Sequence, residues 1–192
     1  MKKKESTFIN MLAALFIVTL ISGFALSYVN IATEGPISEA KLKRKVAAIK
    51  MVVPAFDNNP VSEMKTIFAE GYKDSIEVYV ARMGTEKVGT AIIGMSSKGF
   101  SGLIKVMAGF NPDGTIKNIQ VLEQKETPGL GTKIKSERFI QQYVTKNPAS
   151  FDLKVKKDGG QVDALTGATI STRAFSAAVQ QAYEVFENLK KD

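Results

Sequence analysis

The stretch GLIKVMAGFNPDGTIKNIQVLE, residues 102–123, decides the fold of this chain. Two short apolar-rich segments flank the tetrapeptide NPDG, in which Pro112 suits the first corner of a turn and the glycine tolerates a positive φ. This pattern predicts a β-hairpin. A second hairpin is predicted upstream, where alternating apolar residues over 76–80 precede a turn near Gly84 and the returning segment VGTAIIG, residues 88–94.

Helical patterns follow the hairpins. Ser136 is placed to begin a short helix that ends at Asn147-Pro148. Its predicted inward side chains are Phe139, Ile140, Tyr143 and Val144. Apolar residues spaced by three or four positions then predict an amphipathic C-terminal helix of about four or five turns. These residues are Phe175, Ala178, Ala182, Phe186 and Leu189. The predicted fold class is therefore α+β, with antiparallel hairpins and a C-terminal helix in one domain without internal repeats.

The N-terminal segment reads as a membrane anchor. Residues 8–29, FINMLAALFIVTLISGFALSYV, carry no charge and match the roughly 20 apolar residues that cross a bilayer core. A cleaved signal peptide is the alternative, because lysines occupy positions 2–4 and the small residue Ala25 could precede a cleavage site. The run exceeds the ~7–15 apolar residues of signal peptides, which favours a single transmembrane helix. Lysines before the helix, with none directly after it, predict a cytoplasmic N-terminus and a C-terminal part outside.

The segment after the anchor is predicted to break and restart. Gly35-Pro36 should end the exit segment, and Ser38 should cap a helix. The shared face of that helix would hold Leu42, Val46 and Ile49. The predicted division is a cytoplasmic tip and transmembrane anchor over 1–33, a stalk or first helix over 34–60, and a ligand-binding domain over 61–192.

Composition excludes several chemistries. The chain has no histidine and no cysteine, so it cannot by itself ligate an iron–sulfur cluster, and it lacks the usual haem and zinc ligands. It also lacks a histidine general base, so we expect no metal site and no catalytic residue, and any redox role needs an organic cofactor. The net charge of +7 is scattered along the sequence, and therefore predicts no nucleic-acid partner.

Two loops could carry a ligand. In ETPGLG, residues 126–131, Pro128 fixes one φ angle while two glycines permit a tight turn whose amides can approach a ring; an ordinary turn also explains the pattern. In DALTGAT, residues 163–169, the hydroxyl of Thr169 lies near the start of the last helix, where unpaired N–H groups suit a phosphate. A plain N-cap is the alternative there, from Thr169, Ser171 or Thr172, and Arg173 would either contact the phosphate or be solvated.

The string D-x-x-T-G-A-T resembles the flavinylation motif of the FMN-binding domain family, in which a flavin transferase joins FMN through its phosphate to the final Thr or Ser. ETPGLG resembles the second hallmark of that family, at the expected distance. With the N-terminal helix, the whole chain resembles the G subunits of Rnf ion-translocating electron-transport complexes. It departs at Gln124, where the family often has a histidine two residues before the Glu, so no proton transfer is expected from that position.

The resemblance implies a role for each motif residue and makes residues 61–192 an FMN-binding domain. Thr169 would carry FMN as a covalent phosphoester. The transferase would recognise Asp163, Thr166, Gly167 and Ala168, and the isoalloxazine would be lined by Glu126, Thr127, Pro128, Gly129, Leu130 and Gly131.

The implied function is electron transfer, in a membrane-bound ion-translocating ferredoxin:NAD oxidoreductase complex. The chain would be redox-active but not catalytic alone, and its domain would lie on the periplasmic or extracellular side of the cytoplasmic membrane. Implied partners are the other subunits, including iron–sulfur and flavin subunits, the transferase and the lipid bilayer. Three alternatives remain: the C subunit of a sodium-pumping NADH:quinone oxidoreductase, a flavinylated relay for an extracytoplasmic reductase, and a non-redox membrane-anchored binding module.

Overall fold

The computed structural model describes residues 7–67 and 75–191 and divides into two compact units, residues 1–43 and 44–192. One long helix, α1 (Phe8–Val52), begins in the first unit and ends in the second. The predicted three-part division at residues 33 and 60 stays a prediction.

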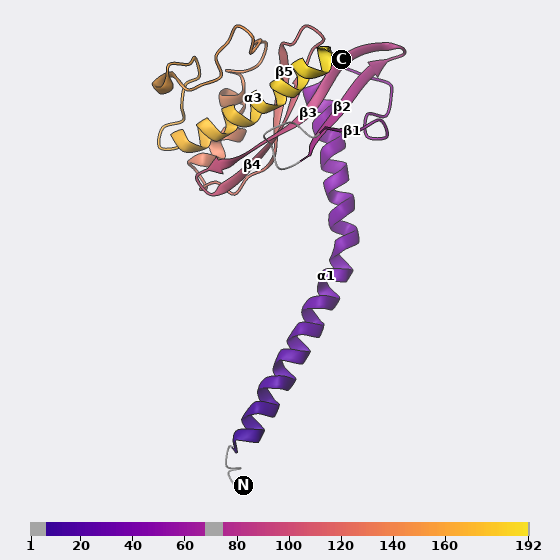
Figure 1. Cartoon of the computed structure of the whole chain (residues 1–192), viewed down its shortest axis with the longest axis vertical. Coiled ribbons are helices and arrows are strands. Elements are labelled where there is room, and N and C mark those ends of the chain that lie inside the picture. The colour runs from indigo at the N-terminus through magenta and orange to yellow at the C-terminus, as the bar shows by residue number, and fades with distance from the viewer. Residues whose placement is uncertain (1–6, 68–74, 192) are drawn as a thin grey trace. The chain divides into compact units, whose positions relative to one another are not determined.

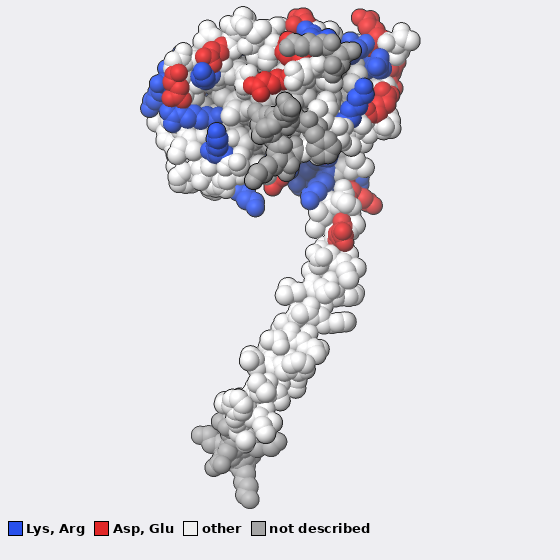
Figure 2. Space-filling view, in the orientation of Figure 1, with Lys and Arg blue, Asp and Glu red and all other residues white. Residues whose placement is uncertain are grey.

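The first unit contains the apolar part of α1, residues 8–33. Its most apolar window has a mean hydropathy of 2.2 and none of that window is buried, so the helix is long and apolar enough to cross a membrane. Figure 2 shows this part of the helix without Lys, Arg, Asp or Glu, whereas side chains of both charges are interspersed on the visible face of the second unit. The predicted anchor helix is therefore present.

The predicted break at Gly35-Pro36 is wrong, because α1 continues through Pro36. A proline inside a helix removes one backbone hydrogen bond, but long helical segments on both sides can sustain the helix cooperatively. Ser38 does not cap a new helix; its hydroxyl donates to the carbonyl of Gly35 at 2.7 Å. The hydroxyl of Thr33 likewise donates to the carbonyl of Val29 at 2.8 Å, so hydroxyls bond helix carbonyls on both sides of the proline.

The second unit is built on a five-stranded antiparallel sheet whose strands follow chain order (Figure 1). The β2–β3 turn contains Gly84, and β4 returns into β5 through Gly114, which has a φ of 91°. Both predicted hairpins are thereby confirmed. The strands are β1 (Lys65–Ile67), β2 (Ile76–Met83), β3 (Glu86–Gly99), β4 (Gly102–Phe110) and β5 (Ile116–Glu123).

Helices cover both faces of this sheet. The C-terminal helix α3 (Thr169–Lys191) packs on one face, where a side chain at Gly94 would meet the carbonyl oxygen of Ala178. The last residues of α1, with Ile49 and Val52, pack on the other face. The predicted inward residues of α3 are buried or partly buried, and the helix is longer than predicted, at 23 residues. On the predicted face of the preceding helix, Leu42 is exposed instead of packed.

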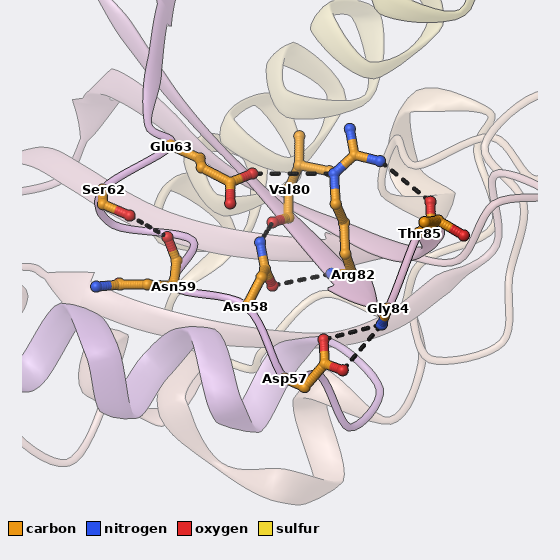
Figure 3. A network of polar contacts seen from close by, with 9 residues as sticks. All are labelled: Asp57, Asn58, Asn59, Ser62, Glu63, Val80, Arg82, Gly84 and Thr85. Carbon is orange, nitrogen blue, oxygen red and sulfur yellow. Dashed lines mark hydrogen bonds and ion pairs between the residues drawn. The ribbon is translucent and has the colours of Figure 1, made fainter.

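Polar contacts fasten the segment that follows α1 to the end of β2 (Figure 3). Both carboxylate oxygens of Asp57 accept the backbone N–H of Gly84, at 3.0 and 2.9 Å. The side chain of Asn58 donates to the carbonyl of Val80 and accepts from the N–H of Arg82, each at 3.0 Å. The edge of the sheet and the end of α1 are thereby held in one unit.

The connection from β5 to α3 is compact but mostly irregular. The predicted helix from Ser136 to Asn147 is confirmed only over α2 (Glu137–Ile140). The chain then makes turns, and Thr145 has a φ of 64°, which is incompatible with a right-handed helix. Ser136 precedes α2, yet its hydroxyl donates to the carbonyl of Lys133 instead of capping the helix. The side chains of Phe139, Ile140 and Tyr143 are buried and that of Val144 is partly buried, as predicted. Two 3₁₀ helices complete this connection, η1 (Gly131–Lys135) and η2 (Lys156–Asp158).

Candidate functional site

The two predicted loops meet around a buried carboxylate. Glu126 is only 4% exposed, although it opens the exposed turn ETPGLG. One carboxylate oxygen accepts the backbone N–H of Ser101 in the β3–β4 turn at 3.0 Å. The other accepts the hydroxyl of Ser171 in the first turn of α3 at 2.5 Å. Glu126 therefore ties three segments that are distant in the sequence.

Glycine makes this convergence possible. A Cβ at Gly131 would lie 2.7 Å from the Ser171 hydroxyl and 2.8 Å from a Glu126 carboxylate oxygen. A Cβ at Gly99 would lie 2.7 Å from the other carboxylate oxygen. Real Cβ atoms do not make contacts this short, so packing favours glycine at position 131.

The rest of ETPGLG forms an exposed, stiff turn. Gly129 has a φ of 75°, and its N–H donates to the Thr132 hydroxyl at 3.0 Å. The side chains of Thr127, Pro128 and Leu130 are exposed. Of the six residues predicted to line a ring, Glu126 and Gly131 are therefore buried supports, and the four between them form the available surface.

Gln124 braces this turn. Its side-chain oxygen accepts the backbone N–H of Glu126 at 2.6 Å. The amide thus fixes the residue whose carboxylate joins the loops.

The second loop lies against the first. Gly167 has a φ of 74°, and a Cβ there would lie 3.4 Å from Cδ2 of Leu130. At the start of this loop, the N–H of Asp163 donates to the side chain of Gln142 at 2.8 Å, and the exposed Asp163 carboxylate pairs with Lys156 at 2.8 Å. The structure thus brings the two predicted motifs together.

The hydroxyls of the DALTGATIST segment differ in what they bond. Ser171 is bound to Glu126, and Thr172 is fully buried, accepting the N–H of Leu165 at 3.1 Å and donating to the carbonyl of Ala168 at 3.0 Å. Thr166 is exposed in the turn before the helix. Thr169 is partly buried at the first residue of α3, and within the described residues its hydroxyl has no hydrogen-bond partner.

Arg173 lies one helical turn after Thr169 and therefore on the same side of α3. Its guanidinium forms two hydrogen bonds of 2.7 Å with the carboxylate of Asp158. These bonds and the positive charge lower the pKa of Asp158. A guanidinium has five N–H donors, so this pairing leaves donors available to a second anion.

A groove of about 970 Å³ runs beside the same stretch of α3. Arg173 and Gln180 line it from the helix, Lys98 from β3, and Lys154 from the preceding loop. Over the described residues, no group of three acidic, histidine or cysteine side chains could hold a metal ion.

These residues fit a phosphorylated organic cofactor. An unpartnered hydroxyl stands at the start of a 23-residue helix, where the helix dipole and free N–H groups favour an anion. The apolar Leu130 lies close by, over Gly167. The start of α3 thus suits a phosphate group, and an exposed turn lies close to it.

Sequence reasoning missed Ser101, Gln142 and the bond made by Ser171. Their partners lie 25, 21 and 45 residues away, so local spacing gives no signal for the first two. For Ser171, its position near the start of a predicted helix is a signal for a hydrogen-bonded hydroxyl, but it does not identify Glu126 as the partner.

Residues 99–184, which contain both loops and most of α3, match the family model described as the FMN-binding domain. The class of protein that this match indicates is one with an FMN-binding domain.

Most of the chain also matches the G subunits of ion-translocating oxidoreductase complexes. The one from Cereibacter sphaeroides is 32% identical over 88% of this chain and 80% of its own length. The one from Vibrio atlanticus is 34% identical over 79% of this chain and 77% of its own length. The Acetobacterium woodii relative, the G subunit of a Na⁺-translocating ferredoxin:NAD⁺ oxidoreductase complex, is 27% identical over 92% and 90%. The chain belongs to this family of G subunits, which confirms the resemblance drawn from the motifs.

Among solved structures, the crystal structure of Shewanella oneidensis NqrC is 22% identical, with a TM-score of 0.47 over 73% of this chain and 70% of that chain.

Proposed function

We propose that this chain is the electron-transfer subunit of a membrane-bound ion-translocating ferredoxin:NAD oxidoreductase complex, and that its FMN is joined through the phosphate to the Thr169 hydroxyl. One observation carries the attachment point: Thr169 holds the unpartnered hydroxyl at the start of α3, whereas Ser171 and Thr172 are hydrogen-bonded and buried. The chain covers 77–90% of the length of the G-subunit relatives, which supports this function over the C subunit of a NADH:quinone oxidoreductase.

When bound, FMN supplies the capacity to accept and donate electrons that none of this chain's side chains has. The chain's own residues hold and orient it. The start of α3 stabilises the remaining phosphate charge by about 0.3–1 kcal/mol. Arg173 is placed to add a charge-assisted hydrogen bond while it remains paired with Asp158.

The two loops have separate tasks in this proposal. The second loop, with Asp163, Thr166 and Gly167 exposed and Ala168 buried, presents Thr169 to a flavin transferase. The exposed turn from Thr127 to Leu130 covers part of the ring, while Glu126 and Gly131 support it from below.

Partners are required because the chain has neither cysteine nor histidine to hold a metal cluster. Iron–sulfur and flavin subunits of the same complex would deliver and remove the electrons. The chain is thus a redox component of a translocase and is not catalytic alone. We place its domain on the outer side of the membrane, because lysines 2–4 lie before the apolar helix.

The attachment is tested by intact mass. The full chain, produced with a flavin transferase, should gain the mass of one FMN-phosphoryl group on the peptide that contains Thr169. Thr169→Ala should abolish this gain, and Thr169→Ser should retain it because serine keeps the hydroxyl. Thr85→Ala, in the exposed β2–β3 turn, is the matched control. Covalent flavin on the Thr169→Ala protein would contradict the proposed attachment.

A further inference from the structure

Three exposed apolar side chains lie on the segments that Glu126 ties together. They are Phe100, 68% exposed, Leu130, 45% exposed, and Ile170, 47% exposed. Over the described part of the second unit, the other exposed large apolar side chains are Met51, Met64 and Met83. Phe100 is the most exposed of all six, although phenylalanine is among the residues that gain most from burial.

Each of these three side chains is next to a residue fixed at the carboxylate. Phe100 precedes Ser101, whose N–H is bonded to Glu126, and Ile170 precedes Ser171, whose hydroxyl is bonded to it. Leu130 precedes Gly131, where an added Cβ would meet both Glu126 and Ser171. A single buried group therefore sets the spacing of three exposed apolar residues from three separate segments.

Two of these residues, Leu130 and Ile170, lie beside the proposed attachment point, and Phe100 is linked to it through the bond between Ser101 and Glu126. Ile170 is the direct neighbour of Thr169 in the first turn of α3. Leu130 lies over Gly167, two residues before Thr169. A group bound to the Thr169 hydroxyl is thus held next to an apolar surface by its own tether, which raises its effective concentration there.

We propose that Phe100, together with Leu130 and Ile170, forms the contact surface for the isoalloxazine ring of the FMN on Thr169, with the Phe100 ring as its aromatic partner. This inference rests on the proposed function. It assigns a role to the β3–β4 turn, which lies outside both sequence motifs. A flat, largely apolar ring suits the patch, because aromatic pairs gain from offset or edge contacts as well as from burial.

Two alternatives to this ring contact are that the ring binds in another site, or that a partner protein covers the patch. The groove beside Arg173 has a mixed lining, in which a ring would pack beside charged side chains such as Lys98, Lys154 and Asp158 as well as apolar ones. A partner protein could cover the apolar patch, but the tether at Thr169 keeps the ring beside it whether or not a partner is bound. Both alternatives predict different results for variants of Phe100.

The test compares Phe100→Ala with Met83→Ala in the full chain produced with its transferase. Met83 is 45% exposed at the end of β2, on a turn that does not contact Glu126. Intact mass first establishes the FMN content of each protein. Flavin fluorescence, its quenching by iodide and the midpoint potential are then measured on the purified proteins.

We expect full FMN content in both variants. In Phe100→Ala the undocked population of the ring should rise roughly 2- to 10-fold, the equivalent of one aromatic contact, with brighter flavin fluorescence and stronger iodide quenching. Phe100→Tyr should restore the wild-type values, and Met83→Ala should not differ from them.

Full FMN content with unchanged fluorescence and quenching in Phe100→Ala would overturn the ring contact and leave the proposed function intact. Unchanged flavin fluorescence and quenching in Phe100→Ala, together with weaker assembly into the membrane complex, would overturn the ring contact and indicate that the patch binds a partner protein. Absence of FMN from the wild-type protein would overturn the proposed function, and this inference with it.

Discussion

At the scale of single residues, Glu126 is the unusual group. A buried carboxylate normally pairs with a cation, but over the described residues this one has no ion-pair partner and is satisfied by one amide and one hydroxyl. Its two bonds draw the β3–β4 turn and α3 towards the ETPGLG turn. The site therefore depends on hydrogen-bond geometry at one side chain.

Comparing Glu126→Ala with Glu126→Gln separates the effect of the Glu126 hydrogen bonds from the effect of its charge. Glu126→Ala removes the acceptor of the Ser101 N–H and of the buried Ser171 hydroxyl, and leaving that buried hydroxyl unsatisfied costs about 1–3 kcal/mol. We expect a lower unfolding temperature and less FMN on Thr169. Glu126→Gln should be close to wild type, because its oxygen can accept the Ser101 N–H while its NH₂ group donates to Ser171. Thermal unfolding and intact mass measure both effects, and equal losses in the two variants would contradict this positioning role.

The structural roles of the site residues were predictable only where they depend on neighbours in the sequence. The start of α3 at Thr169 follows from the helix pattern after the string DALTGAT, and the positive φ angles of Gly129 and Gly167 fall on glycines of the two motifs. The burial of Glu126 could not be predicted, because its partners are 25 and 45 residues away. A charged residue in an exposed turn would be expected to face solvent.

At the scale of elements, the alternation of apolar residues and the turn residues predicted the strands, whereas tertiary packing determined where the helices end. The β4–β5 hairpin was predicted from the turn around Gly114. Helix ends were predicted less well. Pro36 is accommodated inside α1, and the helix expected after Ser136 stops after Ile140 because buried aromatic contacts, not helix propensity, hold that segment.

The close approach of α3 to β3 gives a prediction about an element. A Cβ at Gly94 would lie 1.9 Å from the carbonyl oxygen of Ala178, so Gly94→Ala must displace α3 or the strand. Overpacking of this kind costs about 1–3 kcal/mol. We expect a lower unfolding temperature for the detergent-solubilised full chain. Lys117→Ala, at an exposed position of β5, is the control, and equal unfolding temperatures for the two variants would rule out the packing argument.

At the scale of the whole molecule, the order of anchor and domain was clear from composition, but the boundary between the compact units was not. The units divide between residues 43 and 44, inside a helix that continues without a break. Helical periodicity does not change at that point; what changes is packing, with Leu42 exposed and Ile49 buried. Sequence patterns report periodicity, and therefore cannot locate a boundary that depends on contacts.

The orientation in the membrane can be tested directly, because the chain has no cysteine of its own. In the proposed orientation, lysines at positions 2–4 keep the N-terminus in the cytoplasm, and we expect the domain to be outside. A single cysteine introduced by Ser150→Cys, in an exposed loop, should react with a membrane-impermeant maleimide in intact cells. Ser6→Cys, before the apolar helix, should react only after the cells are opened. Labelling in the reverse order would place the domain, and with it Thr169, in the cytoplasm.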